Sequence, residues 1–176
     1  AKYMLEFAQK TLTIFNDIVL KNKIYLELIK GDTFIHKTYY MGLVNPDDKV
    51  DFYDGQIKIV DPEGKEFARF SGRDYLKHIA EHVEPWTYIK FPYLKQKGWQ
   101  GFVDGKDGSV YRVAPLARLN VSSGFTTPLA QAEYERMYDI LGEKPAHYTL
   151  AFHWARLIEL LYAAENISRL ADEPAL

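Results

Sequence analysis

The sequence predicts a helix-rich α+β fold, and two observations carry that prediction. Apolar residues recur every three or four positions through the first 30 residues, which is the period of helices that bury one face, and residues 114–170 carry residues typical of helix starts and ends. Between residues 38 and 70, short β-branched and aromatic runs alternate with turn residues, which indicates a small antiparallel β-meander. No tract rich in Pro and Gly is long enough to divide the chain, so we predict a single unit over residues 1–176.

The first 30 residues are predicted to form long helix. Leu5, Leu12, Phe15 and Val19 mark its apolar stripe, and the polar patch at residues 21–23 predicts a bend or interruption. The chain opens inside this helix, so we expect a segment cut from a longer protein. Helices taken out of a larger core leave apolar faces uncovered, and we therefore predict self-association, or a hydrophobic patch along this stripe.

The meander is predicted from turn chemistry between strand-like runs, at residues 45–48, 54–55 and 61–64. Asp54-Gly55 lies between two such runs and predicts a type I′ hairpin turn, because both central residues of that turn need positive φ. The predicted strands cover residues 39–44, 50–53, 56–60 and 66–70.

Residues 71–113 are predicted to form a mixed aromatic segment. Ser71, with Asp74 three residues later, is typical of a capping box that opens a short helix ending before Pro85. A glycine-rich loop at residues 101–108 then precedes a short strand at residues 109–113.

The last third, residues 114–170, is predicted to be helical. Pro115 can open one helix, and Thr127 and Gly142 are suited to begin and end the next. The last helix is expected from about residue 146 to residue 170.

Composition excludes several classes of protein. The formal net charge is −2 and no dense Lys/Arg cluster is present, so nucleic-acid binding is unsupported. No apolar run approaches the length of a membrane helix and the amino terminus lacks a signal-peptide pattern, so we predict no membrane span and a cytoplasmic location. The chain contains 0 Cys, which removes disulfides and cysteine-ligated metal sites.

The stretch from His78 to His82 matches H-x-x-E-H, the reversed zinc-protease pattern. On a helix the two histidines would share a face and could bind Zn²⁺, with Glu81 as general base. Catalytic zinc also needs a third protein ligand, and no recognisable downstream motif supplies one. We therefore favour a polar helix face over zinc catalysis.

The residues alone therefore assign no catalytic, cofactor-binding or metal-binding residue. The glycine-rich loop lacks the spacing of a phosphate-binding loop, and Ser122-Ser123-Gly124 is no nucleophile elbow. Arginines and a glutamate among apolar residues need partners, which indicates internal networks or a subunit interface. The candidate structural or interface residues are His78, His82, Trp86, Pro115, Arg118, Asn120, Arg156 and Glu159.

Seven blocks of sequence together carry a resemblance to one family. The blocks are residues 37–44, 52–55, 78–86, 88–93, 111–120, 127–130 and 155–165. Through them the chain resembles an internal segment of the large subunit of the bidirectional, NAD-reducing NiFe-hydrogenase of the cyanobacterial type. The blocks follow the same order as in that family, and the resemblance extends over nearly the whole chain.

This resemblance implies H₂ oxidation and proton reduction at a Ni–Fe centre with CO and cyanide ligands. It implies as partners a small subunit with iron–sulfur clusters and a diaphorase module that reduces NAD. The family holds its metals with four thiolates from two cysteine motifs, and this chain has neither. No metal or catalytic residue is therefore carried over, and the chain alone is expected to be an inactive, metal-free scaffold.

The resemblance also implies a fold, the helix-rich α+β fold of the hydrogenase large subunit, which the quinone-site subunit of respiratory complex I shares. Two alternatives stay open at this point. The first alternative to the hydrogenase prediction is a complex-I-type segment without nickel. The second is a non-catalytic interaction module that docks a partner through residues 86–102.

Overall fold

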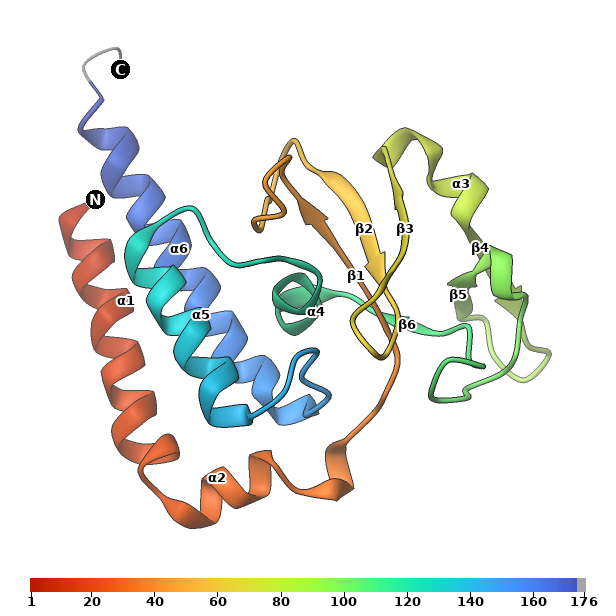
Figure 1. The fold of residues 1–176 in the computed structure, drawn as a ribbon, viewed down its shortest axis with the longest axis horizontal. Coiled ribbons are helices and arrows are strands. Elements are labelled where there is room, and N and C mark those ends of the chain that lie inside the picture. The colour runs from red at the N-terminus through yellow and green to blue at the C-terminus, as the bar shows by residue number, and fades with distance from the viewer. Residues whose placement is uncertain (174–176) are drawn as a thin grey trace. The chain divides into compact units, whose positions relative to one another are not determined.

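The computed structural model describes residues 1–173, and these form two compact units (Figure 1). The helical unit combines residues 1–35 with the described residues from Gly124 onwards, and the sheet unit is His36–Ser123. The sequence predicted one unit because no linker separates the parts. The division arises instead because the first and last helices pack on each other, while the segment between them folds around its own sheet.

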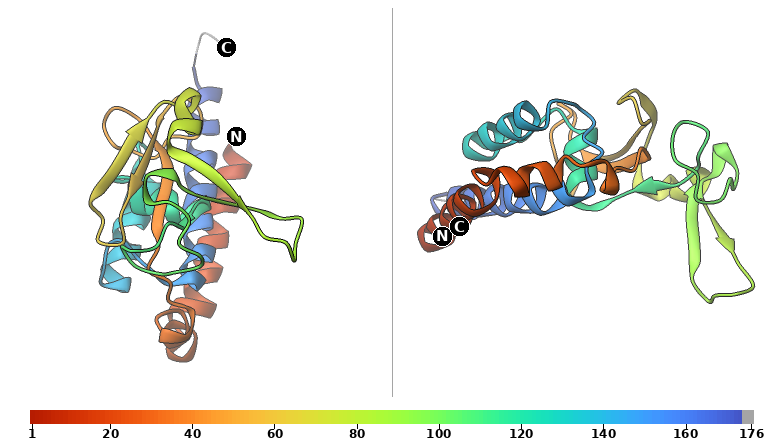
Figure 2. Two further views of the ribbon diagram at one scale, coloured as in Figure 1. Left: turned by 90° about the vertical axis from the view of Figure 1, so that its right-hand side faces the viewer. Right: turned by 90° about the horizontal axis from the view of Figure 1, so that it is seen from below.

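The helical unit is built on the longest helix, α6. Helices α1 and α5 both pack along it, as Figures 1 and 2 show. The elements of this unit are α1 (Lys2–Phe15), a π-helix (Asn16–Leu20), α2 (Lys23–Ile29), a 3₁₀ turn (Asp32–Phe34), α5 (Pro128–Leu141), a 3₁₀ turn (Thr149–Ala151) and α6 (Phe152–Ala171).

Helix α1 packs on α6 through small side chains. Ala8 is fully buried against Leu161 and Ala164, and Leu5 and Leu12 pack on the same cluster. The predicted apolar patch is therefore covered only in part: Leu5 and Leu12 are packed, whereas Phe15 and Val19 line an open apolar hollow. The uncovered apolar residues of the first 20 positions lie elsewhere on the helix surface, and they are Tyr3, Met4, Phe7, Ile14 and Ile18.

The predicted interruption of the first helix is confirmed. A π-helix ends at Leu20, and Asn22 then adopts an extended conformation. Its Oδ1 accepts a 3.0 Å hydrogen bond from the Ile24 amide, which caps α2. The polar patch thus ends one helix and begins another.

The boundaries predicted for α5 are also confirmed. Pro128 lies in its first turn, and Gly142 ends it with a left-handed φ of 83°. The last helix begins later than predicted, at Phe152, because residues 149–151 form a 3₁₀ turn.

The sheet unit contains the predicted meander. Strands β1 (Tyr39–Val44), β2 (Gln56–Val60) and β3 (Glu66–Phe70) pair antiparallel in sequence order. Strand β6 (Tyr111–Arg112) adds to β1 in parallel, which completes the order β3-β2-β1-β6.

The turn predicted at residues 45–48 is confirmed, whereas the type I′ turn predicted at Asp54-Gly55 is wrong. The chain reverses at Asn45, whose amide donates to the Lys49 carbonyl at 2.9 Å, and Asp48 takes the positive φ of 60°. Gly55 does not have positive φ, and its role is close approach: a Cβ there would lie 2.5 Å from the Val44 carbonyl oxygen. Residues 50–53 form no strand.

The predicted helix after Ser71 is wrong beyond residue 78. A 3₁₀ turn (Gly72–Asp74) and one helical turn, α3 (Tyr75–His78), lead into strand β4 (Ile79–Val83). This strand pairs antiparallel with β5 (Lys90–Leu94), so its backbone bonds are made across a hairpin. A short apolar run at this length does not distinguish helix from strand, and the long-range pairing decides it.

Both faces of the four-stranded sheet are buried. Helix α4 (Ala114–Val121) covers one face, where it forms a core with β1 and β2. The other face packs against β4 and β5. Its core residues are Tyr39, Ile59, Phe70, Ile79 and Leu94.

Among the described residues, no helix is both long enough and apolar enough to cross a bilayer. The cytoplasmic location stays a prediction.

Candidate functional site

The two histidines of the H-x-x-E-H motif lie on different elements and have different partners. His78 ends α3, and its ring stacks on Phe70 with 3.9 Å between centroids. His82 lies on β4, stacks on Trp99 at 4.4 Å, and places Nε2 2.9 Å from Glu84 Oε1. The shared helical face that the zinc alternative requires does not form. Within residues 1–173, no group of three or more His, Cys, Asp or Glu is arranged to hold a metal ion.

The hairpin of β4 and β5 and the loop after it carry an aromatic cluster. Phe91 and Trp99 stack with centroids 6.0 Å apart, and Phe102 packs edge-on against both. Figure 2 shows this hairpin projecting from the sheet. Trp86 contacts Phe91 at 5.9 Å but stays 69% exposed, so the predicted aromatic segment is part packed cluster and part free surface.

Three candidate residues lie on α4, the helix that covers β1. Pro115 and Asn120 are buried, with Asn120 3% exposed. Arg118 is half-buried, and its guanidinium lies 5.4 Å from the centre of the Phe52 ring. Gly42 of β1 makes this packing possible, because a Cβ there would lie 3.0 Å from the Cα of Arg118. These residues position a helix on a sheet.

Arg156 and Glu159 on α6 have unlike environments. Glu159 is buried, 8% exposed, whereas Arg156 is exposed. Of the two roles predicted for this pair, an internal network does not describe the exposed Arg156, which lies at the rim of an apolar groove, and a subunit interface stays a prediction.

Glu165 is a buried carboxylate that was not predicted from the sequence. Its oxygens accept hydrogen bonds from Thr127 Oγ1 at 2.6 Å and from the amides of Leu129 and Ala130, each at 2.9 Å. These are first-turn amides of α5, so α6 supplies the anionic cap for a neighbouring helix. A carboxylate within the apolar run of α6 was the available signal, but its partners are distant in sequence.

The sheet unit contains a cavity of about 720 Å³, between the sheet and the α3–β4 segment. Its one carboxylate, Glu81, is paired with Lys90 at 2.9 Å. Burial raises the pKa of Tyr111, so this phenol stays neutral. Such a lining can bind an apolar group but presents no nucleophile beside a base. It comprises Met41, Ile57, Phe70, Gly72, Tyr75, Leu76, Ile79, Ala80, Glu81, Pro92 and Tyr111.

The helical unit contains a second hollow of about 530 Å³, which we call the helical groove. It lies between the end of α1, the π-helix, α2 and α6. Its lining is mostly apolar, and it comprises Phe15, Val19, Tyr25, Leu28, Ile29, Leu150, His153, Arg156 and Leu157.

Comparison with known proteins gives the clearest functional signal. The chain is 48% identical, over all of its 176 residues, to the iron–sulfur subunit of the F420-non-reducing hydrogenase of Archaeoglobus profundus, of which it covers 36%. The chain is related to hydrogenase subunits. It is also 38% identical over 173 residues to the NAD-reducing hydrogenase HoxS subunit beta of Cupriavidus necator, covering 98% of this chain and 33% of that protein.

A solved structure supports the same relationship. The crystal structure of an NAD⁺-reducing nickel–iron hydrogenase in the H₂-reduced state matches with a TM-score of 0.77 and 31% identity, over 93% of this chain and 34% of that one. The hydrogenase-related chain thus spans about a third of the length of the curated relatives it matches. No protein-family model matches the sequence.

The names of these relatives correct the family prediction. They are an iron–sulfur subunit and a HoxS subunit beta, so the assignment to the nickel–iron large subunit, with its Ni–Fe centre carrying CO and cyanide, is wrong. The mixed α+β fold is confirmed, whereas its specific description as the large-subunit fold is not supported. The complex I alternative and the free-standing interaction module do not match these relatives and are also wrong.

The name of the Archaeoglobus profundus relative attributes iron–sulfur chemistry to that protein. Iron–sulfur clusters are held by cysteine thiolates, with histidine as an occasional replacement. This chain has 0 Cys, so its residues do not fit such a cluster.

Proposed function

We propose that this chain is a framework segment of a hydrogenase subunit, of the kind that the Archaeoglobus profundus iron–sulfur subunit and HoxS subunit beta represent. The observation that carries the proposal is the 48% identity across all 176 residues to about one third of the Archaeoglobus profundus protein. The TM-score of 0.77 to a chain of an NAD⁺-reducing hydrogenase supports the same role. The segment would shape the surroundings of redox groups that other parts of the complex hold.

The interior of both units supports a framework role. Buried polar groups in each unit serve its packing: Glu165 caps α5, and Asn120 lies in the helix that covers β1. Gly42 lets that helix approach the sheet closely. Buried polar groups of this kind specify one packing arrangement, which suits a rigid support.

The activity, substrate and partners belong to the same proposal. The relatives are named as hydrogenase subunits, so the complex would interconvert H₂ with protons and electrons, and the partners would be its other subunits. His78, His82 and Trp86 would act as structural or interface residues of the sheet unit. Pro115, Arg118 and Asn120 would hold α4 in place.

A chimera tests this function. The matching third of the Archaeoglobus profundus subunit is replaced by this 176-residue chain, and H₂-dependent reduction of a viologen dye is measured after purification. We expect the chimera to assemble with its partner subunits and to keep activity. A control chimera carrying Gly42→Leu, which pushes α4 away from β1, should lose both. Failure to assemble while the chain itself is folded would refute the proposal.

A further inference from the structure

The helical groove is bordered by apolar side chains that are unusually exposed. Tyr25 and Leu28 line it and are 45% and 51% exposed, which is high for apolar side chains that border a hollow of about 530 Å³. Ile18 and Ile24, on the adjoining helical segments, are 58% and 72% exposed. Exposed apolar side chains gathered around an apolar hollow are typical of a site that another molecule covers.

The charged residues that line the groove are basic, without an acidic counterpart in the described part of the chain. Arg156 and His153 are its basic residues, and no Asp or Glu is among the described residues that line it. Arg156 has no hydrogen-bonding or ion-pair partner within residues 1–173. An arginine at the edge of an apolar groove matches a ligand that presents apolar groups beside a carboxylate.

We propose that the helical groove binds an amphipathic helix that carries a carboxylate beside its apolar side chains, with that carboxylate paired to Arg156. The inference rests on the proposed function, because it draws the helix from the remainder of the hydrogenase subunit. The relatives extend well beyond the matched region, which is 36% of one and 33% of another. Helical walls on several sides suit a helix laid into a groove, with apolar side chains as anchors.

Thiol labelling in the chimera described above tests whether the rest of the subunit covers the helical groove. This chain has 0 Cys, so Leu28→Cys gives one thiol in the segment, and its maleimide labelling is followed by mass spectrometry of the peptide that contains it. We expect labelling in the free 176-residue chain and loss of labelling in the assembled chimera. The matched control is Glu27→Cys, the exposed neighbour on α2, which should label in both. Tyr25→Cys repeats the test if Leu28→Cys impairs folding.

A charge reversal tests the role of Arg156. Arg156→Glu in the chimera should restore labelling of Leu28→Cys, whereas Arg169→Glu, the same reversal at an exposed position of α6, should not. A thiol that labels equally in the free chain and in an active chimera overturns the inference and leaves the proposed function intact. Protection that is already present in the free chain, together with dimers in sedimentation, would show that a second copy occupies the groove and would also overturn it. A chimera that never assembles counts against the proposed function. It also counts against the inference, because the docking helix is drawn from the rest of that subunit.

Discussion

The carboxylate of Glu165 on α6 accepts a 2.6 Å hydrogen bond from the hydroxyl of Thr127, which immediately precedes α5. Thr127 occupies the N-cap position but makes no side-chain cap of its own. Glu165 takes over that function by also binding the amides of Leu129 and Ala130. Glu165 therefore links α6 to the N-terminus of α5.

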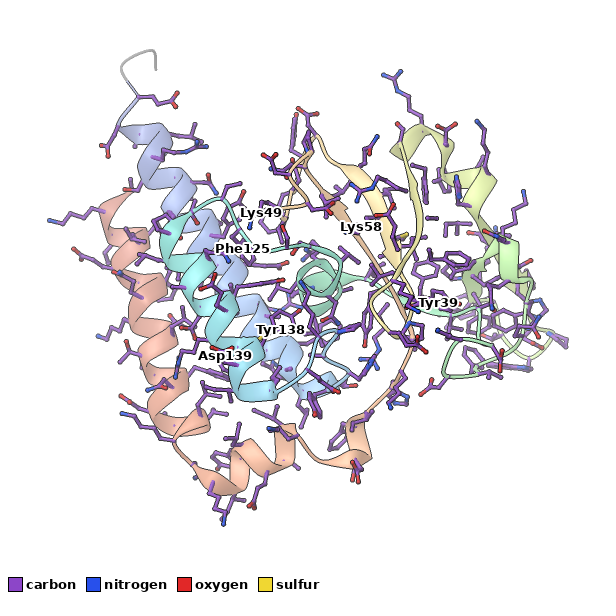
Figure 3. The ribbon with its side chains drawn as sticks, viewed as in Figure 1. Tyr39, Lys49, Lys58, Phe125, Tyr138 and Asp139 are labelled. Atoms are coloured by element: carbon purple, nitrogen blue, oxygen red, sulfur yellow. The ribbon has the colours of Figure 1, made fainter. Side chains whose placement is uncertain are left out.

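Replacing this carboxylate should destabilise the helical unit. Glu165→Ala leaves the Thr127 hydroxyl and two amides without their acceptor, which costs about 1–3 kcal/mol per unsatisfied buried group. We expect a lower urea midpoint by circular dichroism. Asp139→Asn, at an exposed position of α5 labelled in Figure 3, is the control and should change stability by less than about 0.5 kcal/mol. Equal stability of the two variants would contradict the capping role.

Gly42 should not tolerate a side chain. A Cβ there would lie 2.9 Å from Val121 Cγ2 and 3.0 Å from the Cα of Arg118, so α4 would have to move. We expect Gly42→Ala to lower the free energy of unfolding by about 1–3 kcal/mol, as overpacking does. In Gly72→Ala the new methyl group has as its nearest neighbour Ile57 Cδ1, at 4.0 Å. That variant should keep wild-type stability, and a larger loss there than at Gly42 would refute the packing argument.

Acid should weaken an ion network on the sheet. Lys58 on β2, labelled in Figure 3, and Arg69 on β3 both contact Asp48, at 3.0 Å and 2.6 Å. Burial acts to raise the pKa of Asp48, but hydrogen bonds from Arg69 and Lys58 outweigh it and leave the pKa lowered. The Arg69 hydrogen bond is the main cause of the lowered pKa of Glu66.

The sign of the pH effect follows from these lowered values. Stability from the network is present above the unfolded-state pKa values of about 4 and is lost as pH falls through the folded-state values. Because the carboxylates are partly exposed, solvent screening keeps the contribution below about 1 kcal/mol. We expect the urea midpoint to fall between pH 5 and about pH 3, and to fall less in Arg69→Met. An identical pH profile for the two proteins would count against the network.

Zinc should leave this protein unchanged. His78 and His82 are separated onto α3 and β4, so we expect no zinc-dependent shift in Tm for the wild-type chain. His78→Ala should lower stability by about 0.5–1.5 kcal/mol through loss of the stack on Phe70. Stoichiometric zinc in the purified protein, abolished by His78→Ala, would overturn this view.

Local chemistry explains where prediction from sequence succeeded. Asn22 and Gly142 act within a few residues of themselves, as a cap and a left-handed terminator, and both mark helix boundaries correctly. The alternation of strand and turn residues likewise predicted β1, β2 and β3. It predicted the turn at residues 45–48 correctly and the type I′ turn at Asp54-Gly55 wrongly, because Gly55 is required for close approach to Val44 and not for its φ.

The sequence by itself determined the break at Asn22, both ends of α5, the meander and the absence of thiolate ligands, because each depends on residue type or on neighbours a few positions apart. The tertiary structure decided that residues 79–83 form a strand, that Glu165 caps α5 and that Arg156 stands at an apolar groove. Each of these depends on a partner distant in sequence. Hydrogen bonding and burial between such partners act only once the chain has folded, and no local pattern specifies them.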